Sequence, residues 1–203
     1  MLESVPETAT VLRDGRVSVA ELTHVIHQIP PTYDSRSRVL VLGSVPSPKS
    51  REVGFNYGHP QNRFWRVLAA LAGEELPQTT DERRAFCLRH RIALWDVVAE
   101  CDIVGASDAS IRDPKPNPLT QITHFAPIEA IFCTGAKAHA LYRRLCEKEV
   151  GMRAVKLPST SPANAACSME RLLGAYAEIF EHTGTVDADQ LARVTHASVA
   201  GEA

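Results

Sequence analysis

The sequence predicts an α/β fold, a three-layer αβα sandwich with a short, mostly parallel central sheet. Four short apolar runs have the length and continuous character of strands buried on both faces, and helical patterns lie between most of them. Since right-handed crossovers place helices on both faces of a parallel sheet, this order predicts two helical layers. A length of 203 residues with 44% apolar content is sufficient for one such domain.

The expected strands and helices follow from their side-chain spacing. The apolar runs predict strands at residues 38–43, 92–98, 128–135 and 152–158. Apolar residues at i, i+3, i+4 and i+7 predict amphipathic helices that begin near Phe64, Ala138 and Met169, and a charged helix is expected over residues 81–90.

The chain is expected to form one domain with two tails. Residues 1–35 are weakly patterned and end in the proline-rich stretch "IPPTYDSRS", which predicts an N-terminal extension and a lead-in loop. Residues 36–182 carry the strand and helix patterns and form the expected domain. Residues 183–203 are small and polar, so we expect a flexible C-terminal tail with at most one frayed helical turn.

Charge and cysteine usage exclude several classes of protein. The net charge of −2 is unlike that of a protein that binds nucleic acid by bulk positive charge. The five cysteines form no C-x-x-C pair, which argues against a zinc site, an iron-sulfur cluster or a disulfide framework. The sequence has no apolar run of membrane-spanning length and no signal-peptide pattern, so we expect a cytoplasmic protein without a metal or cofactor.

Three loops follow the predicted strands at the edge of the sheet where ligands gather in such folds. They are "GSVPSPKSREVGFNYGHPQN", "CTGAK" and "LPSTSPAN". The first and third lead into helices, whose free backbone N–H groups favour an anion such as phosphate. Ser161 followed by Pro162 is typical of a helix N-cap.

The first loop combines local positive charge with aromatic rings. Between Gly43 and Arg66 it carries four basic residues and one acidic residue, for a local charge of +3. Phe55 and Tyr57 precede the helix and lie outside its apolar stripe. Rings beside basic residues suit a stacked nucleobase, although they could equally hold the loop on the core.

Several well-known motifs are absent. The turn after the first strand lacks the dinucleotide pattern G-x-G-x-x-G, and no P-loop occurs. The H-x-E and P-C-x-x-C pair of zinc deaminases and the G-x-S-x-G of α/β-hydrolases are also missing.

Three blocks of sequence resemble the uracil-DNA glycosylase superfamily. They are Gly43-Ser44-Val45-Pro46-Ser47, then Phe55-x-Tyr57-x-His59-Pro60-x-Asn62-Arg63-Phe64-Trp65, and Leu157-Pro158-Ser159-Thr160-Ser161-Pro162-Ala163-Asn164. The first two resemble the mismatch-specific branch, and the third resembles the superfamily's loop that enters the DNA minor groove. The resemblance covers about residues 36–182. It implies that the αβα sandwich is of the uracil-DNA glycosylase type and that the chain cleaves N-glycosyl bonds in DNA.

Two departures indicate the branch. Val45 stands where mismatch-specific enzymes have a catalytic Asn, and Leu157 stands where the most active uracil enzymes have a His. The pattern instead resembles the hypoxanthine-DNA glycosylase (DNA-deoxyinosine glycosylase) branch, also called family 6. In that branch the Asn of the His-Pro-x-Asn segment, Asn62 here, is regarded as catalytically important.

The resemblance implies a monofunctional base excision repair enzyme. It would flip out hypoxanthine, or also uracil or xanthine, and hydrolyse the glycosidic bond to leave an abasic site. Asn62 would orient water or hydrogen-bond the base, because an amide is no general base at neutral pH. The expected base-pocket residues are Gly43, Ser44, Val45, Phe55, Tyr57 and Thr134. The expected DNA-binding residues are Ser47, Lys49, Ser159, Thr160, Ser161 and Asn164.

Two alternatives remain open at this point. One is a uracil-preferring enzyme of the same fold, and the other is a non-catalytic module that binds damaged DNA or nucleotides. The expected partner is DNA containing deaminated bases, with no membrane involved, and we expect a monomer.

Overall fold

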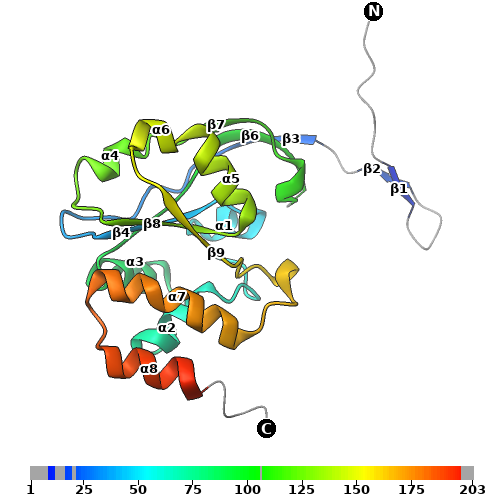
Figure 1. The fold of residues 1–203 in the computed structure, drawn as a ribbon. Coiled ribbons are helices and arrows are strands. Elements are labelled where there is room, and N and C mark those ends of the chain that lie inside the picture. Colours follow the sequence, from blue (N-terminus) through cyan, green and yellow to red (C-terminus); the bar gives the residue numbers. More distant parts are fainter. Residues whose placement is uncertain (1–8, 12–16, 20–21, 106, 198–203) are drawn as a thin grey trace, which may run out of the picture.

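A computed structural model describes residues 9–11, 17–19, 22–105 and 107–197 (Figure 1). Its centre is a four-stranded sheet in the order β5-β4-β8-β9. All neighbouring strands in it are parallel. The strands are β4 (Val39–Gly43), β5 (Ile92–Asp96), β8 (Ala130–Thr134) and β9 (Ala154–Leu157). Each lies within one of the four predicted runs, so the predicted α/β class is confirmed.

The central strands are apolar on both faces because each face packs on a separate core. Val39, Val41 and Phe132 belong to one core cluster, and Leu40 and Leu42 belong to the other. The first cluster includes residues of α2 (Phe64–Ala72), α3 (Thr80–Arg89) and α7 (Met169–Thr183), which lie together below the sheet in Figure 1. The second includes residues of α5 (Ala136–Leu145), on the opposite face. The helix predictions are therefore confirmed, and the two layers surround the sheet as expected.

A second sheet completes the layer beside α5. Strands β3 (Leu22–Ile26), β6 (Val98–Val104) and β7 (Arg112–Pro116) are antiparallel, in the order β3-β6-β7. This sheet was not predicted from the sequence, because β6 begins one residue after β5 and starts inside the apolar run, 92–98, that was predicted as a single strand. Strand β3 belongs to the predicted N-terminal extension, yet it pairs along its whole length with β6. The fold therefore begins earlier than residue 36.

The remaining elements are short. They are β1 (Ala9–Val11), paired with β2 (Val17–Val19), and α1 (Pro48–Val53), η1 (Asp108–Ser110), α4 (Thr120–Thr123), α6 (Glu147–Val150) and η2 (Pro162–Asn164).

The prediction of a flexible C-terminal tail with at most one frayed helical turn is wrong for residues 188–197. Helix α8 (Ala188–Ala197) packs against α7 and α2, and Leu191 is buried in the core beside them. A small apolar stripe was enough because α2 and α7 provide the surface that covers it. Residues 198–203 of the predicted tail lie outside the described residues. In the part of the chain that the structure covers, no helix has both the length and the apolar character needed to cross a bilayer.

Candidate active site

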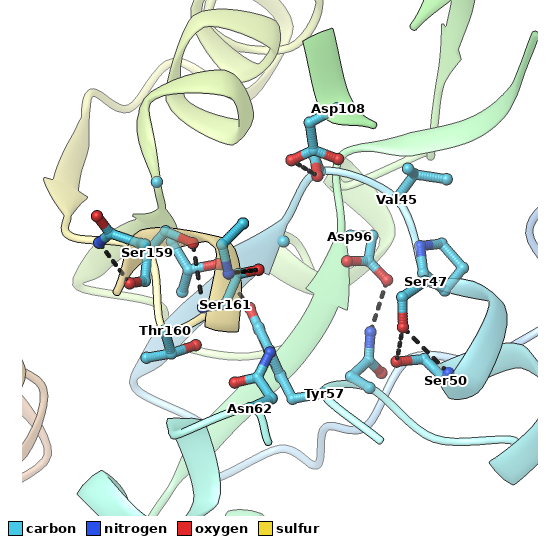
Figure 2. A pocket seen from close by; sticks show the side chains of 18 of the residues that line it. Val45, Ser47, Ser50, Tyr57, Asn62, Asp96, Asp108, Ser159, Thr160 and Ser161 are labelled. Carbon is cyan, nitrogen blue, oxygen red and sulfur yellow. Dashed lines mark hydrogen bonds between the residues drawn. The ribbon is translucent and has the colours of Figure 1, made fainter. Parts of the chain in front are cut away.

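A cavity of about 640 Å³ opens at the carboxyl ends of the central strands. The first loop, the Thr134–Ala136 turn and the loop after β9 all line it, so the three predicted segments do meet. All the predicted site residues line the cavity except Phe55 and Lys49. Figure 2 shows several of these side chains from close by.

Asn62 is held by the start of helix α2. Its side-chain oxygen Oδ1 accepts a hydrogen bond from the backbone N–H of Phe64 at 3.0 Å. Because that backbone group can only donate, the amide orientation is determined, and the two N–H bonds of Nδ2 point the other way. Within the described residues Nδ2 has no hydrogen-bond partner. Asn62 therefore offers donors to the cavity while its oxygen accepts from the first backbone N–H of α2.

Tyr57 lies against the cavity in an unusual backbone conformation. Its φ of 55° is in the left-handed region, which costs a non-glycine residue about 1 kcal/mol or more. Its ring stacks on Phe64, with centroids 3.8 Å apart, and its hydroxyl lies 2.8 Å from Thr134 Oγ1. These contacts hold the strained conformation. Burial, with a smaller contribution from the charge of Asp96, raises the pKa of Tyr57 well above its usual value, so the phenol stays neutral.

The hydroxyl proton of Thr134 is engaged in a hydrogen bond within the protein. Its Oγ1 donates to the backbone carbonyl of Leu42 at 3.3 Å, so the Tyr57 hydroxyl is the donor in the contact between the two side chains. Thr134 can offer the cavity only acceptor lone pairs in this arrangement. Its proposed reading of a base edge remains a prediction.

Phe55 and Lys49 lie away from the cavity. Phe55 is 1% exposed and packs on Trp65, with ring centroids 5.8 Å apart, so it belongs to the core and not to a pocket wall. The bulk of its ring explains this placement, because α2 and α3 offer an apolar surface there. Lys49 pairs with Glu52 at 2.7 Å on α1. No contact places it at the cavity.

The serines of the first loop organise its backbone. Ser47 caps α1 by accepting from Ser50 N at 3.2 Å, and its hydroxyl lies 3.0 Å from that of Ser50. Ser50 in turn accepts from Gly58 N at 3.0 Å. The Ser and Pro content of this loop thus serves the short helix α1, which the sequence analysis missed.

The loop after β9 is also held by its own side chains. Ser161 caps the short helix η2 as predicted, with Pro162 at its first position. Asn164 Nδ2 donates to the Ser159 carbonyl at 2.8 Å, and Ser159 Oγ accepts from Ser161 N at 3.2 Å. Thr160 is 1% exposed, although it contributes to the lining. Ser159 and Ser161 therefore have the most open hydroxyls of this loop.

Arg63 joins the two loops. Its guanidinium donates to the backbone carbonyls of Asn164, at 2.9 Å, and Cys167, and its backbone N–H donates to Thr160 O at 3.1 Å. The sequence analysis did not single it out, because both partners are backbone carbonyls about one hundred residues away. Nothing in the local sequence identifies such acceptors.

The most important residue that sequence reasoning missed is Asp96. It ends strand β5, is 4% exposed and lines the cavity. Asn56 Nδ2 donates to its Oδ2 at 2.6 Å, and His27 Nε2 lies 2.8 Å from the same oxygen. An Asp at the carboxyl end of a predicted strand was a signal that could have identified it.

A second carboxylate, Asp108, lies at the cavity in η1. It accepts a hydrogen bond from Ser44 Oγ at 2.8 Å. Partial removal from water raises its pKa, and the charge of Asp96 adds to this, while the Ser44 hydroxyl and the nearby Lys137 act in the opposite direction. The cavity thus has acidic groups on one side, with Arg51 and Lys156 also in its lining.

Comparisons with known proteins agree on one family. Residues 30–180 match the family model described as the uracil DNA glycosylase superfamily. A hypoxanthine DNA glycosylase from Methanosarcina acetivorans is 32% identical over 143 residues, which cover 70% of this chain and 90% of the relative. A hypoxanthine DNA glycosylase from Methanosarcina barkeri is 32% identical over 153 residues, covering 75% of this chain and 96% of the relative.

A solved structure shares the fold. The solution NMR structure of a candidate uracil DNA glycosylase from Methanosarcina acetivorans superimposes with a TM-score of 0.67 at 29% identity. The match covers 78% of this chain and 98% of the other.

Proposed function

The chain belongs to the uracil DNA glycosylase superfamily and is a DNA glycosylase, and from this premise we propose that it removes hypoxanthine from DNA with Asn62 as its catalytic residue. The two relatives named hypoxanthine DNA glycosylase support the choice of base. The position of Val45, which has no polar group to offer, also supports a branch that does not rely on an amide there.

The observation that carries the proposal is the fixed amide of Asn62. Cleavage of the C1′–N9 bond leaves the electron pair on the base and positive charge on the sugar. N–H donors aimed at the departing base gain strength as that negative charge develops, so they stabilise the transition state more than the ground state. The tethered Oδ1 of Asn62 and its open Nδ2 suit this donor role better than the orientation of water by Oδ1.

The remaining atoms balance through hydrolysis. Water adds its oxygen to C1′ and releases a proton, which the departing base or solvent takes up. The products are free hypoxanthine and an abasic site. Such a reaction needs no amine nucleophile, and the base must first leave the duplex stack to reach the cavity.

We extend the proposal to DNA binding and cellular context. Ser159 and Ser161 would contact backbone phosphates through hydroxyl and backbone N–H groups, so affinity should fall only modestly with salt. A salt dependence that corresponds to about ten or more released counterions would contradict this. We further propose that the enzyme acts as a monomer in the cytoplasm, a reducing setting in which its five free, buried cysteines would stay unpaired.

The test uses oligonucleotides that carry inosine, uracil, xanthine or no damage, with alkali-dependent strand cleavage as the readout. We expect cleavage at inosine, and a fall on the order of 100-fold to 1,000-fold in single-turnover rate for both Asn62→Ala and Asn62→Asp. The aspartate keeps an oxygen that can accept from Phe64 N but has no N–H. This variant therefore removes the donor without removing the hydrogen bond to α2.

A matched control removes a helix cap elsewhere. Thr79 caps α3 through Glu82 N, and Thr79→Ala should cost about 1 kcal/mol of stability without changing the cleavage rate. Full activity of Asn62→Asp would mean that Asn62 serves only the helix. Cleavage at uracil with none at inosine would replace hypoxanthine by uracil as the substrate.

A further inference from the structure

Asp96 presents one free carboxylate oxygen to the cavity. Its Oδ2 is occupied by two donors, Asn56 Nδ2 at 2.6 Å and His27 Nε2 at 2.8 Å. Its other oxygen, Oδ1, has no hydrogen-bond partner among the described residues, although Asp96 is only 4% exposed. Figure 2 shows a dashed line from one Asp96 oxygen to an amide below it and none from the other oxygen.

The neighbouring backbone keeps this oxygen accessible. Gly43 pairs with Asp96 across the sheet, and a Cβ at position 43 would lie 2.2 Å from Oδ1 and 3.4 Å from the Tyr57 hydroxyl. A side chain at position 43 would therefore fill the space in front of the carboxylate. Because Gly43 has no side chain, this space remains part of the cavity, next to Tyr57.

An oxygen of this kind needs a donor from the ligand. A buried carboxylate that accepts too few hydrogen bonds is costly, since its lost hydration is not replaced. The occupant of the cavity must therefore bring an N–H or O–H group to Oδ1. Carboxylates only accept, so a ligand lone pair at the same place would be repelled.

Deamination creates a group that fits this requirement. In adenine the ring atom N1 is an acceptor, whereas in hypoxanthine N1 carries a hydrogen. The same change converts N3 of cytosine into the N3–H of uracil. On the basis of the proposed function, we propose that Asp96 is a specificity-determining residue whose Oδ1 accepts this ring N–H of the flipped base, and that His27 is the residue that positions it.

An acceptor at this position would disfavour adenine. With adenine in the cavity, the N1 lone pair would face Oδ1 and neither group would be satisfied. Sites built around such a polar contact reject ligands that lack it by factors of up to about 10⁴–10⁵. Guanine also has an N1–H, so its exclusion does not come from Asp96.

His27 is buried with Asp96 at this contact. Its side chain is 1% exposed and meets Trp95 edge to face, with ring centroids 6.0 Å apart. It directly follows β3, which belongs to the second sheet and not to the sheet that carries Asp96. Together with Asn56 it places both donors on Oδ2, which leaves the other oxygen for the ligand.

This arrangement makes Asp96→Asn a sharp test. The two donors on the inner side need an oxygen, so the amide oxygen of the variant should face them and its NH₂ group should face the cavity. The substitution therefore converts the cavity group from an acceptor into a donor without changing its size.

The measurement compares inosine with unsubstituted purine, as 2′-deoxynebularine, in the same oligonucleotide. Purine has no N1–H and accepts at N1. Single-turnover rates at several enzyme concentrations separate binding from cleavage. We expect wild type to prefer inosine by at least about 100-fold and Asp96→Asn to reduce this ratio at least tenfold. In the variant, the cleavage rate on purine and adenine strands should fall less than the rate on inosine, or should rise.

Two outcomes would overturn the inference, and a third concerns the function alone. An equal fall on inosine and purine would indicate that Asp96 acts on water or on the sugar. An unchanged ratio with unchanged rates would mean that Oδ1 does not meet the base. Failure of wild type to cleave inosine, with cleavage at uracil, would reject the proposed base while the uracil-to-cytosine ratio still tests Asp96.

The positioning role has its own pair of variants. His27→Gln retains an amide N–H near the position of Nε2, whereas His27→Leu has no donor. We expect His27→Leu to lower the inosine-to-purine ratio and His27→Gln to restore most of it. Equal ratios in both variants, with only a change in melting temperature, would reduce His27 to a structural residue.

The chain provides a matched control pair across β3 and β6 of the second sheet. His24 Nδ1 lies 2.7 Å from Asp102 Oδ1, but these side chains are 54% and 32% exposed and do not line the cavity. His24→Gln and Asp102→Asn should leave the inosine-to-purine ratio as in wild type. A change there equal to that at Asp96 would show that the ratio does not report on the cavity.

Discussion

The floor and the rim of the cavity are built in different ways. The floor consists of Gly43, Asn56 and Asp96, which are buried and hold one another by close contact and short hydrogen bonds. The rim is the loop from Pro158 to Asn164, which is partly exposed except at Thr160 and bonds mainly to its own backbone. We therefore expect the floor to select the base and the rim to hold DNA without reading sequence.

Among the variants that test the floor against the rim, the largest effect is expected from filling the floor. In Gly43→Ala the new Cβ would overlap Asp96 Oδ1, so the carboxylate must move out of its position. We expect the single-turnover rate on inosine to fall by about 100-fold or more, since a small misplacement at a reacting site has effects of that size.

The control for this variant is Gly174→Ala. Gly174 lies in helix α7 with no atom within 4 Å of its added Cβ, so the alanine should leave activity intact and stabilise the helix by up to about 1 kcal/mol. If Gly43→Ala cleaves inosine like wild type, the floor does not need an open Asp96.

A smaller effect is expected from a variant that detaches the rim loop from the first loop. Arg63→Met removes the guanidinium that donates to the Asn164 and Cys167 carbonyls. Hydrogen bonds to charged groups contribute roughly 1.5–3 kcal/mol, so we expect about 2 kcal/mol less stability and a melting temperature lower by about 4–8 °C. KM for DNA should rise more than kcat falls.

Arg66→Met is the matched control, because Arg66 lies on the same helix but is exposed. It should change the melting temperature little. Equal destabilisation by both variants would mean that Arg63 does not fasten the rim loop to the first loop.

The smallest effect is a dependence on pH at Asp108. Its folded-state pKa is raised chiefly by burial, so ionisation costs the folded protein more than the unfolded chain. The folded state therefore loses stability as pH rises from the usual aspartate pKa of about 3.9 through the raised value. Asp108→Asn should be more stable than wild type above this range and equal to it below.

Melting curves between about pH 3 and pH 8 measure this difference. At neutral pH the variant should also bind DNA about threefold more tightly at low salt, because one negative charge is gone, and the gain should vanish at high salt. Glu181→Gln, which removes an exposed carboxylate on α7 outside the cavity, should show neither trend. A constant advantage at every pH would contradict a titrating Asp108.

Short-range patterns in the sequence were sufficient for the central domain. The run around Val41 is apolar at every position because β4 is buried on both faces, and the stripe that starts at Phe64 is a helix that covers one of them. The Ser161-Pro162 pair capped a helix as predicted, although a 3₁₀ helix. Each of these depends on neighbours within a few residues.

Long-range contacts account for what was missed. Strand β3 and helix α8 have weak patterns of their own. Strand β3 is stabilised by pairing with β6, and α8 by packing on α2 and α7. Phe55 has the same local setting as Tyr57, yet it entered the core while Tyr57 lies at the cavity. That division depends on the surface that α2 and α3 provide, which no local pattern describes.

The sequence by itself determined the fold class, the loops that surround the cavity and Asn62 as the candidate catalytic residue. Only the tertiary structure decided how that amide is oriented, and only it brought His27, Asn56 and Asp96 together across 69 and 40 positions of the chain. The physical reason is that strand and helix patterns are local, whereas a buried hydrogen-bond network depends on which distant segments pack against each other.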